Sequence, residues 1–485
     1  MVFSSLQFIL IFMPIFFICY YLAPKRLKNL VLLLGSLSFY AVGTYKTPGH
    51  FVIFIVSMLV DYSAAMLMEK KPGRKRLFLW LGIVFHILAL GFYKYFSFII
   101  NELAGAFPDA GISMPFKILL PIGISFYTFQ GMSYICDVYR GDVKTERNLL
   151  DFCVYISMFA QLIAGPIVNY SMVSRDLHSR EIRRSDALSG FGVFLFGLGL
   201  KVLLANPLGK LWFNVNTIGF ESLSTPLAWM AVFGYAFQIY FDFFGYSLMA
   251  IGLGRMMGFS LPKNFDFPYL SVSMTEFWRR WHMTLGSWFR EYVYIPLGGN
   301  RKGTLRTILN LFVVWLLTGI WHGAGYNFSL WGLMLFVIIT LEKYLYGSFL
   351  EKHPAVGHIY MILLIPLSWM IFEVGRPDQL SALFRRLFPF ISGEGFWSVF
   401  RYDYLKYLKM YWPFFIAAVL LCTHLPFDLL RKLQTLCSGG ADTAASRSAV
   451  LSGRCGLVII LAAVFFGSLY CMYRGFDDPF LYFRF

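Results

Sequence analysis

Long apolar runs separated by short charged stretches divide this chain of 485 residues into a series of candidate membrane helices. A helical run of about 20 apolar residues is long enough to cross the hydrocarbon core of a bilayer. Judged by this length, the pattern predicts an all-α polytopic membrane protein with about a dozen transmembrane helices. The predicted spans are residues 6–23, 29–43, 51–68, 77–100, 118–134, 188–204, 226–253, 308–320, 329–345, 358–371, 412–425 and 456–473.

Two further segments are predicted to lie in or at the membrane without crossing it. Residues 149–170 have basic segments on both sides and are interrupted by Gly165-Pro166, which favours a re-entrant or interfacial element. Residues 277–294 combine arginine with tryptophan and phenylalanine, a composition typical of an amphipathic helix at the level of the lipid headgroups. The aromatic side chains of that helix are Trp278, Trp281, Trp288 and Phe289.

The distribution of basic residues predicts the orientation of the chain. The cluster at residues 69–76 marks a cytoplasmic loop, because lysine and arginine collect on that side of a membrane. The loop at residues 101–115 contains neither residue, which favours an external position. Counting spans from these two loops places both termini outside, and residues 474–485 then form an external C-terminal tail.

Composition supports this class of protein, since 58% of the residues are hydrophobic and only 14% are charged. Soluble domains carry about 25% charged residues. The net charge of +16 comes from short basic clusters between apolar runs, which is typical of loops that contact anionic lipid headgroups and not of nucleic-acid binding. The same charge could attract a phosphorylated cofactor or an acidic carrier protein. The seven cysteines are scattered, so we expect no metal site.

Two histidines stand out because each follows a tryptophan in an otherwise apolar region with arginines between them. They are His282 and His322. A histidine can take a proton from a hydroxyl group near neutral pH, and arginine binds phosphate groups through paired hydrogen bonds. Together these groups suit acyl transfer from a thioester to a hydroxyl. On the residues alone, a structural hydrogen-bonding role for each histidine stays open.

Gln238 and Asp242 lie on one face of a predicted span, because they are four residues apart. A carboxylate inside a membrane helix usually faces a partner or a water-filled path. These two side chains could therefore join neighbouring helices or line a tunnel for the donor.

Seven motifs carry a resemblance to the membrane-bound O-acyltransferase (MBOAT) family, in the branch of bacterial alginate O-acetyltransferase. They are Leu120-Pro-Ile-Gly-Ile-Ser-Phe-Tyr-Thr-Phe-Gln130, Asp137-Val-Tyr-Arg-Gly141, Gln161-Leu-Ile-Ala-Gly-Pro-Ile167, Asn264-Phe-Asp-Phe-Pro-Tyr269, Glu276-Phe-Trp-Arg-Arg-Trp-His282, Tyr294-Ile-Pro-Leu-Gly-Gly-Asn-Arg301 and Trp321-His-Gly-Ala324. The resemblance extends along the whole chain. Residues 1–485 are therefore interpreted as one membrane acyltransferase domain, with residues 255–331 as its catalytic core segment.

The resemblance implies a ring of helices, with re-entrant and interfacial helices around a central tunnel at a thinned part of the membrane. It implies that His322 is the catalytic base and that His282 is the second family histidine. The candidate donor-binding residues are Arg279, Arg280, Arg290, Asn300 and Arg301. The candidate tunnel residues are Gln130, Gln238, Asp242, Trp321 and Asn327.

The function that this resemblance implies is transfer of an acetyl group across a bacterial cytoplasmic membrane toward a cell-surface or exported polysaccharide, as in alginate biosynthesis. The donor would be acetyl-CoA or an acyl carrier protein thioester on the cytosolic side, with no tightly bound cofactor. Membrane lipids and an extracytoplasmic acyltransferase are the expected partners. An alternative is D-alanyl transfer toward teichoic acid. A transporter or channel is disfavoured, because the sequence contains no inverted repeat or pair of interrupted helices.

The aromatic C-terminal segment, residues 479–485, resembles endings seen in this branch and contains a single tyrosine hydroxyl, that of Tyr482. Tyrosine favours the membrane interface, so the segment could serve as an anchor. The alternative is that Tyr482 accepts the acyl group as a covalent relay and passes it to the partner enzyme.

Overall fold

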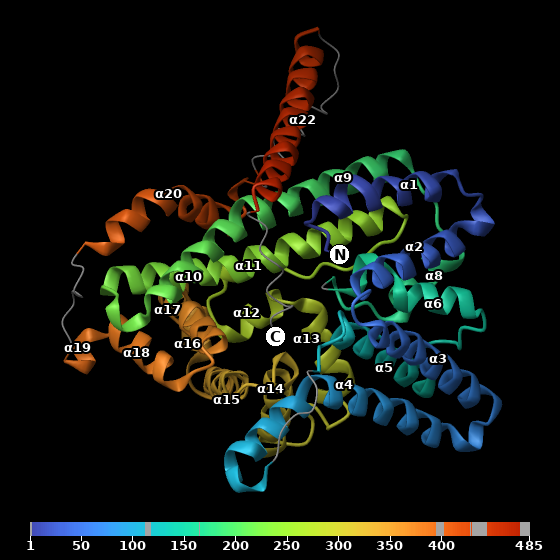
Figure 1. Ribbon diagram of the computed structural model, residues 1–485, viewed down its shortest axis with the longest axis horizontal. Coiled ribbons are helices and arrows are strands. Elements are labelled where there is room, and N and C mark those ends of the chain that lie inside the picture. The colour runs from blue at the N-terminus through green and yellow to red at the C-terminus, as the bar shows by residue number, and fades with distance from the viewer. Residues whose placement is uncertain are drawn as a thin grey trace.

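The computed structural model describes residues 2–111, 118–163, 165–393, 402–426, 428 and 444–475. The regular secondary structure in these ranges is helical (Figure 1). In the view of Figure 1, the short helices α12 (Met274–Arg280) and α13 (Met283–Phe289) lie in the middle of the molecule. Longer helices lie around them, such as α11 (Thr225–Met256), α14 (Thr304–His322) and α4 (Lys75–Ala106). The all-α polytopic class is therefore confirmed, whereas the closed ring and its tunnel stay predictions.

Eight helical segments in the described part of the chain are long and apolar enough to cross a membrane. They are α3 (Pro48–Lys70), the helix Pro72–Ala106 that contains α4 (Lys75–Ala106), the helix Arg184–Ile218 that joins α9 (Arg184–Gly199), η5 (Leu200–Ala205) and α10 (Asn206–Ile218), α11 (Thr225–Met256), α14 (Thr304–His322), the helix Tyr326–Lys352 that begins with α15 (Tyr326–Leu341), α17 (Pro354–Glu373) and the part Gly456–Tyr473 of α22 (Ala444–Tyr473).

The remaining predicted spans correspond to helices that do not meet this criterion. They are the helix Phe8–Leu22 that contains α1 (Met13–Leu22), α2 (Lys28–Gly43), α5 (Ile124–Arg140) and α20 (Asp403–Leu421). The first three have fewer than 18 residues, and α20 begins with charged residues such as Lys406 and Lys409. Short helices cross a bilayer where it is locally thinned. The expected total of about a dozen crossings therefore stays a prediction.

The segment at residues 149–170 is broken into short helices, as its Gly-Pro interruption predicts. It forms α6 (Leu149–Ser157) and α7 (Phe159–Leu162), and α8 (Tyr170–His178) begins at its last residue. The hydroxyl of Tyr155 donates a hydrogen bond of 3.0 Å to the carbonyl of Val168, which ties the two sides of the break together. Both residues are buried, so the irregular backbone lies inside the protein and away from lipid.

The prediction of one amphipathic helix over residues 277–294 is wrong. The chain forms α12 (Met274–Arg280) and α13 (Met283–Phe289) with a break between them, followed by the π-helical turn η8 (Arg290–Tyr294). At the break, Asp266 donates its backbone N–H to the carbonyl of Arg280, and Met283 donates to the carbonyl of Asn264. These bonds to a distant segment replace the helical bonds that would have continued α12.

The aromatic side chains of this region also differ from the prediction of a headgroup position. Trp281, Trp288 and Phe289 are each at most 5% exposed, so they are buried within the protein. Trp288 stacks on Phe129 of α5, with 3.8 Å between the ring centroids. The apolar side chains that the sequence pattern placed at the membrane interface therefore pack inside the protein, where α13 contacts α5.

The helices α9 and α11 run side by side and pack closely (Figure 1). Gly190 and Gly197 of α9 lie against Gly252 and Gly245 of α11, close enough for the two backbones to touch. One turn further along, Lys201 forms an ion pair of 2.5 Å with Asp242, and both side chains are only 2% exposed.

Candidate active site

His322 is the last residue of α14, where the helix ends before an extended glycine. Its side chain is buried among aromatic rings: the centroids of Trp321, Trp331 and Phe372 lie 4.8, 5.2 and 5.1 Å from that of the imidazole. The imidazole also lines a cavity of about 340 Å³, which we call the His322 cavity. The loop at residues 120–123 and the first turn of α5 also line this cavity. His322 therefore faces an internal space and not lipid.

His282 occupies the break between α12 and α13 and has a left-handed backbone conformation, with φ of 44°. Histidine is one of the residues that adopts this conformation more readily than most. Its Nδ1 lies 3.1 Å from the side-chain oxygen of Asn264, so Nδ1 carries the proton that is donated. Complete burial disfavours the imidazolium and lowers the pKa of His282 to about 3. The ring is therefore neutral at physiological pH.

A chain of hydrogen bonds holds His282 in place from the far side of Asn264. The backbone N–H of Ile167 donates a hydrogen bond to the hydroxyl of Thr284, and that hydroxyl donates one to the side-chain oxygen of Asn264. Both hydrogen bonds are 3.0 Å long. The amide nitrogen of Asn264 donates to Ser247 of α11 over 3.1 Å. The network therefore joins three segments that are distant in the sequence and fixes the orientation of the His282 ring.

His282 lines a second cavity of about 460 Å³, which we call the arginine cavity. Arg279 and Arg290 line it together with Trp278, Tyr294 and Trp315. Because guanidinium groups bind phosphate well, this cavity suits a phosphorylated donor.

The Trp321 ring lies close to both histidines. The centroid of its indole ring is 4.8 Å from that of His322 and 6.4 Å from that of His282, and the ring lines the His322 cavity. The two histidines therefore line different cavities and have one aromatic ring beside both.

The candidate donor residues divide into two groups. Arg279 and Arg290 line the arginine cavity, as expected from their positions beside His282. Arg280 turns away and forms an ion pair of 2.7 Å with Glu276 one helical turn earlier. Asn300 and Arg301 lie in an exposed turn and are not among the residues that line this cavity.

The candidate tunnel residues are buried, but Trp321 is the one among them that lines either of the two cavities. Gln130 lies in α5 and Gln238 in α11, and Asp242 pairs with Lys201. Asn327 donates a hydrogen bond of 2.5 Å to the carbonyl of Phe372, whose ring packs on His322. Asn327 thus supports the wall behind His322 from outside the cavity.

Comparison with known proteins matches residues 142–375 to the family model of MBOAT, the membrane-bound O-acyltransferase family. The chain is 38% identical to a probable alginate O-acetylase of Pseudomonas putida over 399 residues. This alignment covers 80% of the chain and 81% of the Pseudomonas protein. The chain is 32% identical over 414 residues to a peptidoglycan O-acetyltransferase of Helicobacter pylori, covering 77% of each. It is 27% identical over 241 residues to a teichoic acid D-alanyltransferase of Bacillus subtilis, covering 47% of this chain and 60% of that protein.

The chain belongs to the membrane-bound O-acyltransferase family. It is a multi-pass membrane enzyme that transfers an acyl group to a hydroxyl.

Sequence reasoning missed three residues that shape this acyltransferase site. Asn264 opens one of the family-like motifs, but its contact with His282 spans 18 residues and cannot be read from the pattern. Lys94 lines the His322 cavity, and Lys201 pairs with Asp242. Each lysine is the single Asp, Glu, Lys or Arg of its predicted span, residues 77–100 and 188–204. A lone charge in an apolar span is itself a signal of function or pairing.

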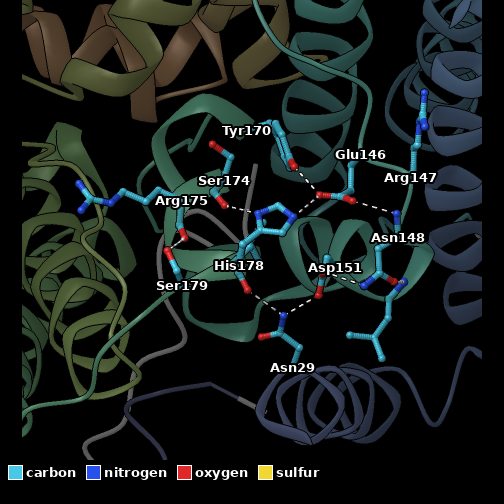
Figure 2. A network of polar contacts seen from close by, with 12 residues as sticks. Asn29, Glu146, Arg147, Asn148, Asp151, Tyr170, Ser174, Arg175, His178 and Ser179 are labelled. Atoms are coloured by element: carbon cyan, nitrogen blue, oxygen red, sulfur yellow. Dashed lines mark hydrogen bonds and ion pairs between the residues drawn. The ribbon is translucent and has the colours of Figure 1, made fainter. Parts of the chain in front are cut away.

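A second polar cluster of the acyltransferase lies at α6 and α8, where Glu146, Asp151 and His178 approach one another within 4.8 Å (Figure 2). One oxygen of Glu146 accepts a hydrogen bond from the hydroxyl of Tyr170 and lies 3.0 Å from Nε2 of His178, and its other oxygen accepts from a backbone N–H. Asp151 accepts from two asparagine side chains. Since every carboxylate oxygen already has a protein donor, the cluster acts as a brace between segments.

Tyr482, in the aromatic segment at residues 479–485, lies outside the described residues, so its predicted relay role is carried forward as a proposal.

Proposed function

We propose that this enzyme transfers an acetyl group from a cytosolic thioester donor, across a bacterial cytoplasmic membrane, toward a cell-surface or exported polysaccharide. The observation that carries the proposal is the position of His322. It is a buried imidazole on the wall of one cavity, and the Trp321 ring beside it is also close to His282, which lines a second cavity together with two arginines. A donor and an acceptor could thus approach the same ring from different sides.

In the proposed reaction His322 is the general base. It takes the proton of an acceptor hydroxyl while the hydroxyl oxygen bonds to the carbonyl carbon of the thioester. The carbonyl electrons move to oxygen and give a tetrahedral oxyanion. When that oxyanion collapses, the carbon–sulfur bond breaks and the leaving thiolate takes the proton from His322. The products are an ester and a free thiol, and His322 returns to its neutral form.

His282 has a different role in this scheme. Its pKa of about 3 keeps it uncharged, and its hydrogen bond to Asn264 holds it at the edge of the arginine cavity. Arg279 and Arg290 would bind the phosphate groups of the donor there. We therefore assign His282 to shaping the donor entrance and not to proton transfer.

The relatives support acetyl over D-alanyl transfer and a glycan as the acceptor. The match to the alginate O-acetylase of Pseudomonas putida covers 80% of the chain at 38% identity, whereas the match to the teichoic acid D-alanyltransferase of Bacillus subtilis covers 47% at 27%. Acetyl-CoA is the proposed donor, with an acyl carrier protein thioester as the alternative. An extracytoplasmic acyltransferase is the proposed partner that completes transfer to the polymer.

The test uses the full chain in lipid nanodiscs together with the extracytoplasmic partner, with radiolabelled acetyl-CoA, acetyl-carrier protein or D-alanyl-carrier protein as donor and a soluble glycan as acceptor. Transfer of acetyl by the wild type is expected, and His322→Ala should abolish it. His358→Ala is the matched control, because His358 is an exposed histidine of α17 and should leave the rate unchanged. Full transfer by His322→Ala would contradict the proposed mechanism, and transfer of D-alanine alone would change the proposed substrate.

We also propose that Tyr482 accepts the acetyl group before the partner enzyme does. A tyrosyl ester would form by the same steps, with the phenol hydroxyl as acceptor. Tyr482→Phe should then stop acetylation of the exported polymer in cells while donor binding to the purified protein stays normal. Normal polymer acetylation in that variant would exclude the relay.

A further inference from the structure

Lys94 brings a basic side chain into the His322 cavity from a helix that is mostly unburied within the protein. In α4, only 17% of the most apolar window is buried, yet Lys94 lines the cavity beside His322. Its ammonium donates a hydrogen bond to the carbonyl of Trp321 and lies 5.8 Å from the centroid of the Trp321 ring. The side chain is therefore turned inward and held next to the proposed catalytic base.

The depth of Lys94 along α4 shows that its inward orientation is unusual for a lysine in a membrane helix. Lys94 lies 19 residues after Lys75, which begins α4, and that distance is about 28 Å along a helix. A lysine near the end of a membrane helix ordinarily extends its ammonium toward the headgroups, where water solvates it. Lys94 instead contacts the end of α14, so some other interaction has to offset the loss of water.

No carboxylate faces Lys94 from the described residues that line the cavity. Among the described residues that line the cavity, the polar side chains are Lys94, Ser125 and His322, and none is acidic. The remaining wall is formed by aliphatic and aromatic side chains and by glycine. In such a poorly solvated space a single positive charge interacts strongly with a negative charge that develops nearby.

Anchoring of α14 alone does not account for a charged residue at this position. The next residue, Tyr95, donates its hydroxyl to the carbonyl of Ile320, so it ties down the same helix end without a charge. An ammonium group has three protons, and the Trp321 carbonyl uses one of them. The cavity is where the others can find an acceptor.

We propose that Lys94 is a catalytic residue whose ammonium stabilises the tetrahedral oxyanion of acyl transfer at His322, an inference that rests on the proposed function. As the acceptor oxygen bonds to the thioester carbon and its proton passes to His322, the carbonyl oxygen gains the negative charge. A proton of Lys94 donates a hydrogen bond to that oxygen without being transferred. When the carbonyl re-forms and the thiol leaves, Lys94 is unchanged, so the step needs no further reactant.

The experiment compares Lys94→Met, Lys94→Gln and Lys94→Arg with Tyr95→Phe in the nanodisc assay with acetyl-CoA. Removing one oxyanion donor lowers kcat by about 10²- to 10³-fold in other enzymes. We expect a loss of this size in Lys94→Met and Lys94→Gln with little change in the KM for acetyl-CoA, and recovery of most of the rate in Lys94→Arg. Tyr95→Phe should keep a near-normal kcat, because it removes an anchoring hydrogen bond but no charge.

Each other outcome has a separate meaning. Equal losses in Lys94→Gln and Tyr95→Phe would overturn the proposal in favour of helix anchoring, and so would a normal kcat in Lys94→Gln. A rise in KM at unchanged kcat would also overturn it. Lys94→Gln keeps a hydrogen-bond donor for the Trp321 carbonyl and carries the test if Lys94→Met fails to fold. If the wild type transfers no acetyl group with any donor, the proposed function fails instead.

Discussion

At the scale of single residues, the site depends on how an unusual backbone conformation is held at His282. The left-handed φ of 44° ends α12 and turns the imidazole toward the arginine cavity. Asn264 supports this conformation twice, through its side chain to Nδ1 of His282 and through its carbonyl to the N–H of Met283. Strained residues persist where surrounding contacts determine them, and they gather at functional sites.

The first prediction concerns His282→Asn. Asparagine adopts the left-handed conformation readily, so the fold should be kept. We expect the KM for the donor to rise about fivefold. This corresponds to about 1 kcal/mol, the typical contribution of one hydrogen bond, here the one between His282 and Asn264 that holds the donor entrance in shape. Because burial lowers the pKa of His282 to about 3, the ring stays neutral between about pH 5 and 8. The acid limb of the pH–rate profile should therefore keep its position.

Steady-state kinetics across this pH range check the prediction, with His322→Asn as the comparison that should remove activity. A shift of the acid limb in His282→Asn would mean that His282 titrates during turnover. In that case His282, and not only His322, takes part in proton transfer.

At the scale of helices, close glycine contacts between α9 and α11 set the frame that carries the site. Ser247 of α11 holds Asn264, so the position of α11 affects His282 through one intermediate residue. In a membrane, small residues let the backbones of two helices approach closely, and the van der Waals contacts that follow stabilise the pair. The Lys201–Asp242 ion pair fixes the register of the same two partners.

The second prediction compares Gly197→Ala with Gly192→Ala, both in α9. A Cβ on residue 197 would lie 2.5 Å from the carbonyl oxygen of Gly245, so the helices would have to separate. Overpacking of this kind costs about 1–3 kcal/mol, and the melting temperature in detergent should fall. At residue 192 the nearest atom is a Leu461 methyl group at 3.9 Å, so Gly192→Ala should be neutral or slightly stabilising. Equal melting temperatures would show that this contact is not tight.

Sequence patterns predicted the long helices well and the central short ones poorly. Apolar length alone defines spans such as α3 and α11, since both are encoded locally. The break at His282 is not local, because it depends on Asn264 and on Ile167 reached through Thr284. The histidines could be found from the sequence as polar groups in an apolar chain. Their arrangement around Trp321 could not, since it requires α14 and α13 to meet.

At the scale of the whole molecule, hydrogen bonds link the site to two segments that the charge pattern predicts to lie on opposite sides of the membrane. Residues 137–147 are charged and predicted to be cytosolic, whereas residues 101–115 are predicted to be external. Arg140, beside the loop at residues 141–147, donates to the carbonyl of Glu291 in η8, and η8 also supplies Arg290 to the arginine cavity. On the other side, Glu102 accepts a hydrogen bond from Tyr326, four residues after His322. The proposed path from donor to acceptor therefore requires the arginine cavity to face the cytosol.

The last prediction tests this orientation by labelling introduced cysteines in a chain whose own seven cysteines are replaced by serine. Lys144 and Asp109 are both exposed and represent the two sides. Because basic loops remain in the cytosol, Lys144→Cys should react with a membrane-impermeant maleimide in inverted vesicles and not in intact cells. Asp109→Cys should react in intact cells. The opposite labelling pattern would mean that the arginine cavity faces outward, where a cytosolic thioester cannot reach it. The proposed direction of transfer would then be wrong, even if His322 is the base.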